Sequence, residues 1–571
     1  MTLQKHNPLF RIRFLSVCIF LFALVLIGRL YFLQIIESDK YLNKADRQYQ
    51  STSKNVFDRG TIFFQNKDAS LVSAATLRSG FIIAVNPEVL KDSEAVYLKV
   101  NEIMPTSHDE FIAKATKIGD PYEEIATHVD GEIGKKISDL KIPGLQAYKE
   151  RWRFYPGGNT ASHVVGLLGF KGDEYAGRYG LERQYEKILQ RNDGAYVNFF
   201  AQIFSDIKSV TKGDESLEAD IITTIEPTVQ SHLQGVLEET NKKWSSDGTG
   251  AIVMNPMTGE IYAMEFYPSF DPNNSGEEKN ASIFSNPIVE NIYEMGSVIK
   301  TLTMASGIDA GVVTANTTYY DRGYLMINNK RVGNFDDKER GIVSMQDVLS
   351  QSLNVGAAFV EQKLGNARFS EYMYNFGLGN KTGIELPNEA KNLVTSLDSK
   401  IDIDLASASF GQSIALTPIS TISAISVIAN GGTTVKPHLV KSVKYKVGLS
   451  KDTEIGLGQR VIKRETSEEV SRMMVYSMDN VLANGTLKLP RHSVAVKTGT
   501  AQIAKPGGGG YYEDRILHSF VGFFPAYNPK FIIFMYSVNP KGARFGSETL
   551  TGPFVEMVKF LINYYEVPPD R

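Results

Sequence analysis

Three short groups of residues carry the side chains that an acyl-transfer reaction needs. The first, at positions 297–300, is S-V-I-K; the second, at 352–354, is S-L-N; the third, at 497–500, is K-T-G-T. A serine hydroxyl becomes a nucleophile once a neighbouring base removes its proton, and a buried lysine is such a base when desolvation removes its charge. This set in this order predicts a serine enzyme that forms a covalent acyl intermediate.

The surroundings of the first group distinguish it from similar pairs elsewhere. Ser297 follows Gly296, and an apolar run from Val298 to Ala305 predicts a helix that begins at Ser297. The helix dipole favours negative charge on a nucleophile there, and Lys300 lies on the same face. A lone pair of this kind is usually a helix start with a solvated lysine. Four other serines have lysine at this spacing but stand in polar surroundings: Ser51, Ser138, Ser205 and Ser209.

The second group lies at a junction between two helical apolar patterns, Met345–Leu349 and Val355–Leu364. Taken alone, a helix cap is the commoner use of such residues. Beside a nucleophile, we expect the hydroxyl of Ser352 to relay a proton and the amide of Asn354 to hold a substrate amide.

The third group continues a strand-like run, H-S-V-A-V. An edge strand offers backbone N–H groups to an extended peptide. Lys497 and the hydroxyls of Thr498 and Thr500 could then bind a terminal carboxylate, while Gly499 leaves room for the substrate. A second K-T-G, which begins at Lys381, follows a glycine-rich turn after a helix and is set aside.

Composition restricts the classes of function. The chain has 571 residues, of which 42% are hydrophobic and 22% charged, so it can bury large cores in several domains. A net charge of −3 gives no basic field for nucleic acid. The single cysteine, Cys18, excludes intrachain disulfides and cysteine-based zinc sites. We expect no cofactor and no metal.

The N-terminal segment predicts a membrane anchor. Residues 14–36 carry no charge apart from Arg29, and about 20 apolar residues suffice to cross a bilayer as a helix. Basic residues precede this run, and the first acidic residue is Glu37. The positive-inside tendency therefore places residues 1–13 in the cytoplasm and the rest of the chain outside. The alternative is a cleaved signal peptide, but no A-x-A-like site follows the run.

The remaining chain is expected to form an α+β multidomain protein. Residues 39–213 are mixed and polar, with an acidic, helical-looking stretch around 109–139, and a linker near 212–216 leads to a second region, 219–571. There, strands near both ends with helices between them suggest one mixed, largely antiparallel sheet with a helical insert. The expected elements are strands at 220–225, 251–254, 261–264, 492–496, 520–524 and 531–536, a helix opened by Pro227, and a C-terminal helix over 554–562.

The chain resembles the class B penicillin-binding proteins, which are monofunctional D,D-transpeptidases, over almost its whole length. Two family positions differ, because Met295 and Thr301 stand where proline is usual. Besides the three groups, the resemblance rests on D-R-G-T-I at 58–62, R-F-Y-P-G at 153–157, G-L-E at 180–182 with Tyr185, Y-P-S-F-D-P-N at 267–273, F-G-Q at 410–412 with Thr417-Pro418, and T-A-Q at 500–502.

The resemblance implies an architecture and a mechanism. Residues 39–213 would be the family's dimerisation or pedestal domain, and residues 219–571 its serine transpeptidase domain, with a penicillin-binding, β-lactamase-like fold. Ser297 would attack the penultimate D-Ala carbonyl of a D-Ala-D-Ala stem peptide with Lys300 as base. Ser352 would pass the proton to the departing D-Ala. The backbone N–H groups of Ser297 and Thr500 would form the oxyanion hole, and β-lactam antibiotics would be trapped at Ser297.

The resemblance also implies a place in the cell. It predicts a single-pass protein of the bacterial cytoplasmic (inner) membrane with its catalytic domain outside, working with cell-wall synthesis and division proteins that include a polytopic glycosyltransferase. S-F-V-G-F at 519–523 and the V-P-P ending at 567–569 favour a septal role. The alternatives are an elongation-type transpeptidase, a D,D-carboxypeptidase or β-lactamase-like hydrolase, and an acylated sensor or scaffold.

Overall fold

The computed structural model describes residues 58–171, 174–191, 218–446, 448–456, 458–505 and 509–571. Apart from the single position Phe22, the predicted cytoplasmic tail and anchor lie outside the described residues, as does the linker near 212–216. Within the described ranges, no helix combines the length and apolar character needed to cross a bilayer. The described chain forms two compact units, one of residues 77–152 and one of residues 59–76 with 153–571.

The first unit is a small α/β structure. Strand β2 (Leu71–Val85) enters it and pairs with β3 (Glu123–Val129) and β4 (Leu145–Phe154), and α3 (Ser93–Ile103), α4 (His108–Ala115) and α5 (Gly131–Asp139) pack on them. The prediction of a helix around 109–139 is therefore wrong for the middle of that stretch, where β3 lies. The segment of β3 is rich in β-branched residues, and its backbone pairs with β2 instead of forming helical hydrogen bonds.

In the second unit, a mixed sheet joins distant parts of the chain. Strand β1 (Ile62–Gln65) runs antiparallel to the start of β2 and parallel to β7 (Ala219–Thr223). Strand β14 (Val440–Tyr445) pairs with β7 and with β15 (Ser450–Asp452). The predicted strand at 220–225 thus exists, but it belongs to this sheet and not to the one that carries the K-T-G-T group.

Three of the short motifs, those at 58–62, 153–157 and 180–182, meet in one buried ionic cluster. Arg59 Nε donates to Glu182 Oε2 at 2.7 Å, and Arg153 Nε donates to Glu182 Oε1 at 2.6 Å. All three residues are at most 5% exposed. A carboxylate buried between two guanidinium groups is strongly destabilised when either partner is lost, so this cluster ties β1, the end of β4 and α7 (Gly180–Gln184) together. Short elements complete this region: α6 (Ser162–Val165), the β5–β6 hairpin (Leu168–Lys171 and Glu174–Gly177) and α8 (Glu186–Leu189).

A five-stranded antiparallel sheet is the framework of the rest of the second unit. Its order is β16-β17-β18-β8-β9, which leaves β16 at an edge. The prediction of one sheet built from both ends of this region, with a helical insert between, is confirmed, although the mixed pairing lies in the other sheet. The strands are β8 (Gly248–Met254), β9 (Ile261–Tyr267), β16 (Ala495–Ala504), β17 (Tyr511–Phe524) and β18 (Phe531–Val538).

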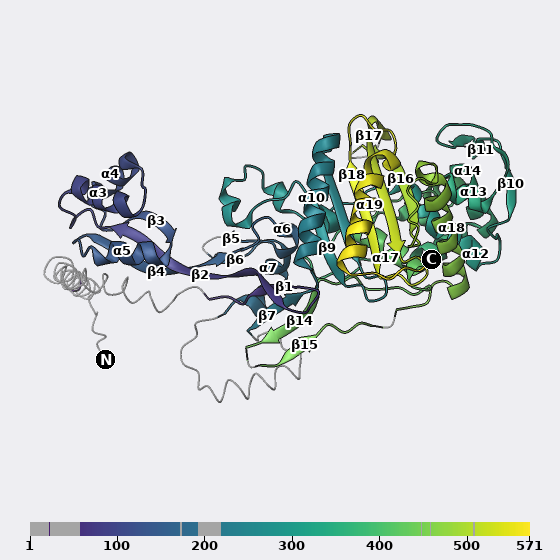
Figure 1. The fold of residues 1–571 in the computed structure, drawn as a ribbon. Coiled ribbons are helices and arrows are strands. Elements are labelled where there is room, and N and C mark those ends of the chain that lie inside the picture. Colours follow the sequence, from purple (N-terminus) through teal and green to yellow (C-terminus); the bar gives the residue numbers. More distant parts are fainter. Residues whose placement is uncertain are drawn as a thin grey trace, which may run out of the picture. The chain divides into compact units, whose positions relative to one another are not determined.

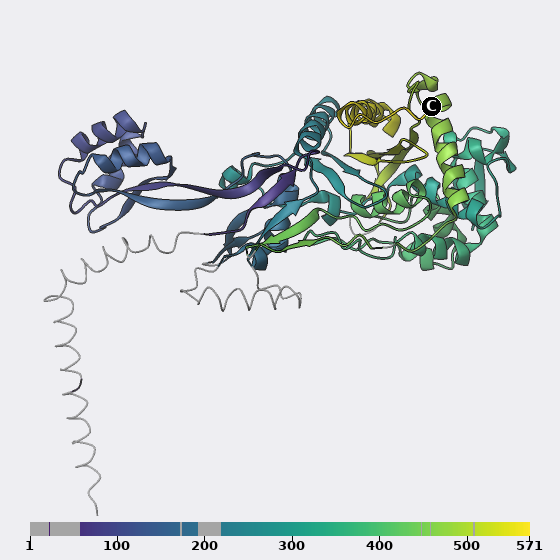
Figure 2. The same ribbon diagram turned by 60° about the horizontal axis from the view of Figure 1, so that its bottom comes forward.

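Alternate side chains of these strands enter two different cores. Val253 and Phe520 pack on one face against α10 (Pro227–Trp244) and α19 (Gly546–Tyr564), which Figures 1 and 2 show side by side. Ile252 and Val521 face the opposite core, formed with the helical insert. The insert contains α11 (Pro287–Glu290), α12 (Lys300–Asp309), α13 (Met345–Ser350), α14 (Asn354–Leu364), α15 (Asn366–Asn375), α16 (Asp402–Ala408), α17 (Pro418–Ala429) and α18 (Arg464–Tyr476), and two short sheets, β10–β13 (Thr318–Asp321 and Gly341–Ser344) and β11–β12 (Tyr324–Ile327 and Lys330–Gly333).

Candidate active site

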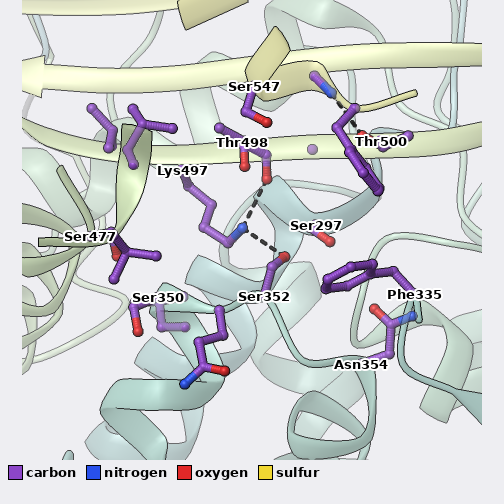
Figure 3. A pocket seen from close by; sticks show the side chains of 18 of the residues that line it. Ser297, Phe335, Ser350, Ser352, Asn354, Ser477, Lys497, Thr498, Thr500 and Ser547 are labelled. Atoms are coloured by element: carbon purple, nitrogen blue, oxygen red, sulfur yellow. Dashed lines mark hydrogen bonds between the residues drawn. The ribbon is translucent and has the colours of Figure 1, made fainter. Parts of the chain in front are cut away.

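The three sequence groups meet in one pocket of about 520 Å³ between the edge strand β16 and the helical insert. Its lining includes Ser297 from the first group, Ser352 and Asn354 from the second and residues 497–500 from the third. Figure 3 shows Lys497 and Ser352 pointing toward each other beside Ser297. Side chains separated by up to about two hundred residues in sequence are therefore within reach of one bound molecule.

The nucleophile candidate lies in a tight turn. Ser297 belongs to a 3₁₀ turn, η5 (Gly296–Ile299), that continues directly into α12. In a 3₁₀ turn, residues three apart eclipse one another, so Lys300 follows on the same side as Ser297. Gly296 has φ +63°, and a Cβ there would lie 2.7 Å from the backbone oxygen of Thr500. Glycine is thus required where this turn packs on β16.

Lys300 is buried, and the hydrogen-bond acceptors of its amine are neutral groups. Its Nζ donates to Ser352 O at 2.6 Å, Asn354 Oδ1 at 2.7 Å and Ser352 Oγ at 3.3 Å. The residue is 1% exposed, and no carboxylate among the described residues forms an ion pair with it. Burial, and then the charge of Lys497, hold the pKa of Lys300 well below its usual value. A neutral amine has two N–H donors and one lone pair, so it can fill two of these three contacts at a time and still act as a base.

Ser352 connects two lysines. Its hydroxyl oxygen accepts from Lys300 and, at 2.9 Å, from Lys497 Nζ, which also donates to Thr498 O at 2.8 Å. Lys497 is 3% exposed, and burial lowers its pKa to about 7. Ser352 has φ +61°, a strained conformation for a non-glycine residue that the turn between α13 and α14 imposes. That backbone conformation places the hydroxyl between the two amines.

Two hydrogen bonds within the protein fix the side chain of Asn354, the first residue of α14. Its Oδ1 accepts from Lys300 at 2.7 Å, and its Nδ2 donates to the backbone oxygen of Gly333 at 3.0 Å. Asn354 lines the pocket, and that its amide holds a substrate amide stays a prediction. In the structure it orients the Lys300 amine and joins α14 to β12.

The K-T-G-T group lies on the edge strand, as the sequence predicts. Thr500 Oγ1 accepts from the backbone N–H of Gly546 at 3.0 Å, which fixes β16 to the start of α19. At Gly499 a Cβ would lie 2.2 Å from Ser519 Oγ and 2.8 Å from Met295 O. The space beside this glycine is therefore taken up by Ser519, whose hydroxyl donates to Met295 O at 2.8 Å. That Gly499, which lines the pocket, also leaves room for a substrate stays a prediction.

Comparison with known proteins decides the family. Residues 249–558 match the penicillin binding protein transpeptidase domain, and residues 56–201 match the penicillin-binding protein dimerisation domain. The chain belongs to the penicillin-binding protein transpeptidase family. This assignment confirms the predicted resemblance and the serine transpeptidase fold.

Relatives match along nearly the whole chain. Stage V sporulation protein D of Bacillus subtilis is 28% identical, with 97% of this chain and 85% of that protein covered. Peptidoglycan D,D-transpeptidase FtsI of Buchnera aphidicola is 25% identical, with 98% and 96% covered. The crystal structure of apo penicillin binding protein 3 from Mycobacterium tuberculosis is similar with a TM-score of 0.65 and 26% identity, over 74% of this chain and 92% of that one.

The second K-T-G of this transpeptidase lies away from the pocket. Lys381 is exposed in a loop without regular secondary structure. The backbone N–H and hydroxyl of Thr382 and the N–H of Gly383 all donate to the carboxylate of Glu389. This turn is occupied by an internal carboxylate, which agrees with its rejection on sequence grounds.

Several pocket residues carried no sequence signal. The rings of Phe335 and Phe545 meet edge to face with centroids 5.5 Å apart, one from the β12–β13 loop and the other just before α19. Both line the pocket. They belong to no recognisable motif, so only the folded chain brings them to the site.

The two departures from the family pattern are buried: Met295 is 1% exposed, and Thr301 donates its hydroxyl to Val298 O at 2.7 Å.

Proposed function

We propose that the protein is a penicillin-binding D,D-transpeptidase that cross-links peptidoglycan stem peptides through an acyl-enzyme on Ser297. One observation carries the assignment of roles: two buried lysines, Lys300 and Lys497, share the hydroxyl of Ser352 beside Ser297 in a chain of this family. Buried lysines whose hydrogen-bond acceptors are neutral groups favour the uncharged form, which can move a proton.

In the acylation step, Ser297 Oγ attacks the carbonyl carbon of the penultimate D-alanine. The hydroxyl proton passes to the neutral amine of Lys300 as the C–O bond forms. The N–H groups of Ser297 and Thr500 stabilise the oxyanion, for which one donor is worth about 3–4 kcal/mol. The contact between Gly296 and the Thr500 backbone supports this pairing, because it keeps the turn and the strand together.

In the second half of the step, the C–N bond breaks and the terminal D-alanine leaves as an amine. Its proton comes from Lys300 by way of Ser352 Oγ, the acceptor that both lysines share. The amine of a neighbouring stem peptide then attacks the acyl-enzyme, giving up a proton along the same route. The products are a new peptide cross-link and a free Ser297.

Peptide mapping after incubation with a labelled β-lactam tests the assignment. The Mycobacterium tuberculosis protein of similar fold has been crystallised in complex with aztreonam and with ampicillin, so both are suitable probes. We expect one adduct, on the peptide that contains Ser297. An adduct on another serine, or none at all, would contradict the proposal. A β-lactam is preferred over substrate because its acyl-enzyme is long-lived.

The two K-T-G sequences provide a matched pair of lysine variants. We expect Lys497→Ala to slow acylation by roughly ten- to a hundredfold, because a lysine–carboxylate hydrogen bond is worth about 1.5–3 kcal/mol. Lys381→Ala should stay within about twofold, since an exposed lysine contributes little. Second-order acylation constants for a carboxylate-bearing β-lactam decide between them. If Lys381→Ala were the slower variant, the assignment of β16 as the substrate strand would fail.

The cellular role we infer is septal cell-wall synthesis by a single-pass protein of the bacterial cytoplasmic membrane, with the catalytic domain outside. The name of the related FtsI proteins, peptidoglycan D,D-transpeptidase, supports the reaction. The apolar run at 14–36 supports the anchor. Partners would be D-Ala-D-Ala stem peptides and other membrane proteins of wall synthesis and division, including a polytopic glycosyltransferase.

A further inference from the structure

Glu294, three residues before Ser297, contacts two other segments of the catalytic region. Its Oε1 accepts from the backbone N–H of Ser413 at 3.1 Å, and both its carboxylate oxygens lie 3.0 Å from the hydroxyl of Tyr511. Among the described residues, no lysine, arginine or histidine forms an ion pair with it. The carboxylate is thus held by neutral donors alone, one from the loop after α16 and one from the start of β17.

Both contacted segments border the reacting groups. In the loop that contains Ser413, Gly411 O accepts a hydrogen bond from the backbone N–H of Gly296 at 3.1 Å. The two segments are so close that a Cβ at Gly411 would lie 2.1 Å from Gly296 O. Tyr511 pairs with Ala504 in the β16–β17 ladder, four residues beyond Thr500. Glu294 therefore joins the nucleophile turn to the outer end of the hairpin whose edge faces the pocket.

The bonding depends on the charge of this carboxylate. Burial raises the pKa of Glu294 to about 7, against the opposing effect of the two hydrogen bonds. Burial and the nearby Glu294 raise the pKa of Tyr511 to about 12, so the phenol stays a donor throughout the neutral range. Above about pH 7 the carboxylate accepts from both donors. Below it, one oxygen carries a proton and accepts less well.

We infer that Glu294 is a positioning residue for catalysis. By holding Tyr511 and Ser413, it keeps the nucleophile turn and the outer part of β16 in one arrangement, so that Ser297 Oγ and the Thr500 N–H act on the same carbonyl group. The inference rests on the proposed acyl-transfer function. It predicts that this tie affects the rate at which Ser297 is acylated more than it affects folding.

The experiment measures acylation constants with a β-lactam across the neutral range for the full chain and for Glu294→Gln. The amide resembles protonated Glu294, because its NH₂ group cannot accept from Tyr511. We expect a fall of about tenfold above neutral pH, the loss expected when one charge-assisted hydrogen bond is removed. The wild-type to variant ratio should approach one as pH falls through about 7. Taking the ratio cancels the titrations of Lys300 and Lys497, which both proteins share.

Two further variants make the test specific. Tyr511→Phe removes only the shared hydroxyl and should slow acylation by a similar factor, while the double variant should be no slower than either single one. Glu361→Gln is the matched control, because burial raises the pKa of Glu361 to about 7 as well. Glu361 lies on α14 and does not line the pocket. That variant should acylate as the wild type does at every pH.

The outcomes separate this inference from the proposed function. A Glu294→Gln effect that is the same at all pH values would mean that the residue serves packing only, and would overturn the inference. So would an unaffected Tyr511→Phe protein, or strictly additive losses in the double variant. If the wild type itself fails to form an adduct on Ser297, the proposed function is wrong instead. Thermal unfolding of each variant shows whether a lost rate reflects a lost fold.

Discussion

Ser297→Ala should abolish covalent labelling by β-lactams and leave the protein folded. The variant removes the hydroxyl of the η5 turn that continues directly into α12, and with it the atom that we propose forms the acyl bond. We expect the acylation rate to fall by roughly four orders of magnitude or more, to below detection. Gel fluorescence with a labelled β-lactam and intact-protein mass spectrometry measure the loss.

A second serine of the same pocket is the matched control. Ser350 also lines the pocket but lies at the end of α13, and its hydroxyl is directed to Asp347 O. Ser350→Ala should therefore label at nearly the wild-type rate. Equal labelling of wild type and Ser297→Ala would exclude Ser297 as the nucleophile. A Ser297→Ala protein that unfolds at a much lower temperature would leave the loss attributable to folding, so melting curves accompany both variants.

The sequence predicted the framework of this site well because local patterns carry it. The apolar run after Ser297, the two helical patterns around Ser352 and the strand before Lys497 each specify an element by its period. Once those elements pack, their end residues meet at the open edge of the sheet. The edge position of β16 followed from the same reasoning, since the K-T-G-T group needs an unpaired strand to receive a peptide.

What could not be predicted depends on long-range contacts. Glu294 and Tyr511 are separated by 217 residues, and neither carries a recognisable local pattern. That Gly499 also makes space for Ser519 of the paired strand could not be predicted from the sequence, because it depends on strand pairing. Residues 123–129 lie within the longer acidic stretch for which a helix is predicted, yet pairing with β2 makes them a strand. In each case a tertiary contact overrides or supplies what the local sequence does not.

Burial of the two lysines is the feature on which the chemistry depends most. A motif gives the residue type and spacing, but a lysine at such a position is usually solvated and charged. Here Lys300 is almost fully enclosed, and its acceptors are a backbone oxygen, a hydroxyl and an amide. None of these neutral groups stabilises an ammonium as a carboxylate would. The enclosure, and the second amine of Lys497 nearby, are what lower its pKa.

Lys300→Met should therefore slow acylation strongly while ligand binding persists. Methionine is close to lysine in length and apolar, so it fills the buried space without a charge, although the acceptors on Ser352 and Asn354 lose a donor at a cost of about 1–3 kcal/mol in stability. Loss of a general base slows the step by roughly a hundred- to ten-thousandfold. Stopped-flow acylation and equilibrium binding measure the two effects separately.

In the wild type the rate should fall as acidification protonates Lys300, whereas the residual rate of Lys300→Met should lack that titration. If the variant acylates normally at neutral pH with an unchanged pH profile, Lys300 is not the base. Lys497, the other lysine that donates to the Ser352 hydroxyl, would then be the remaining candidate.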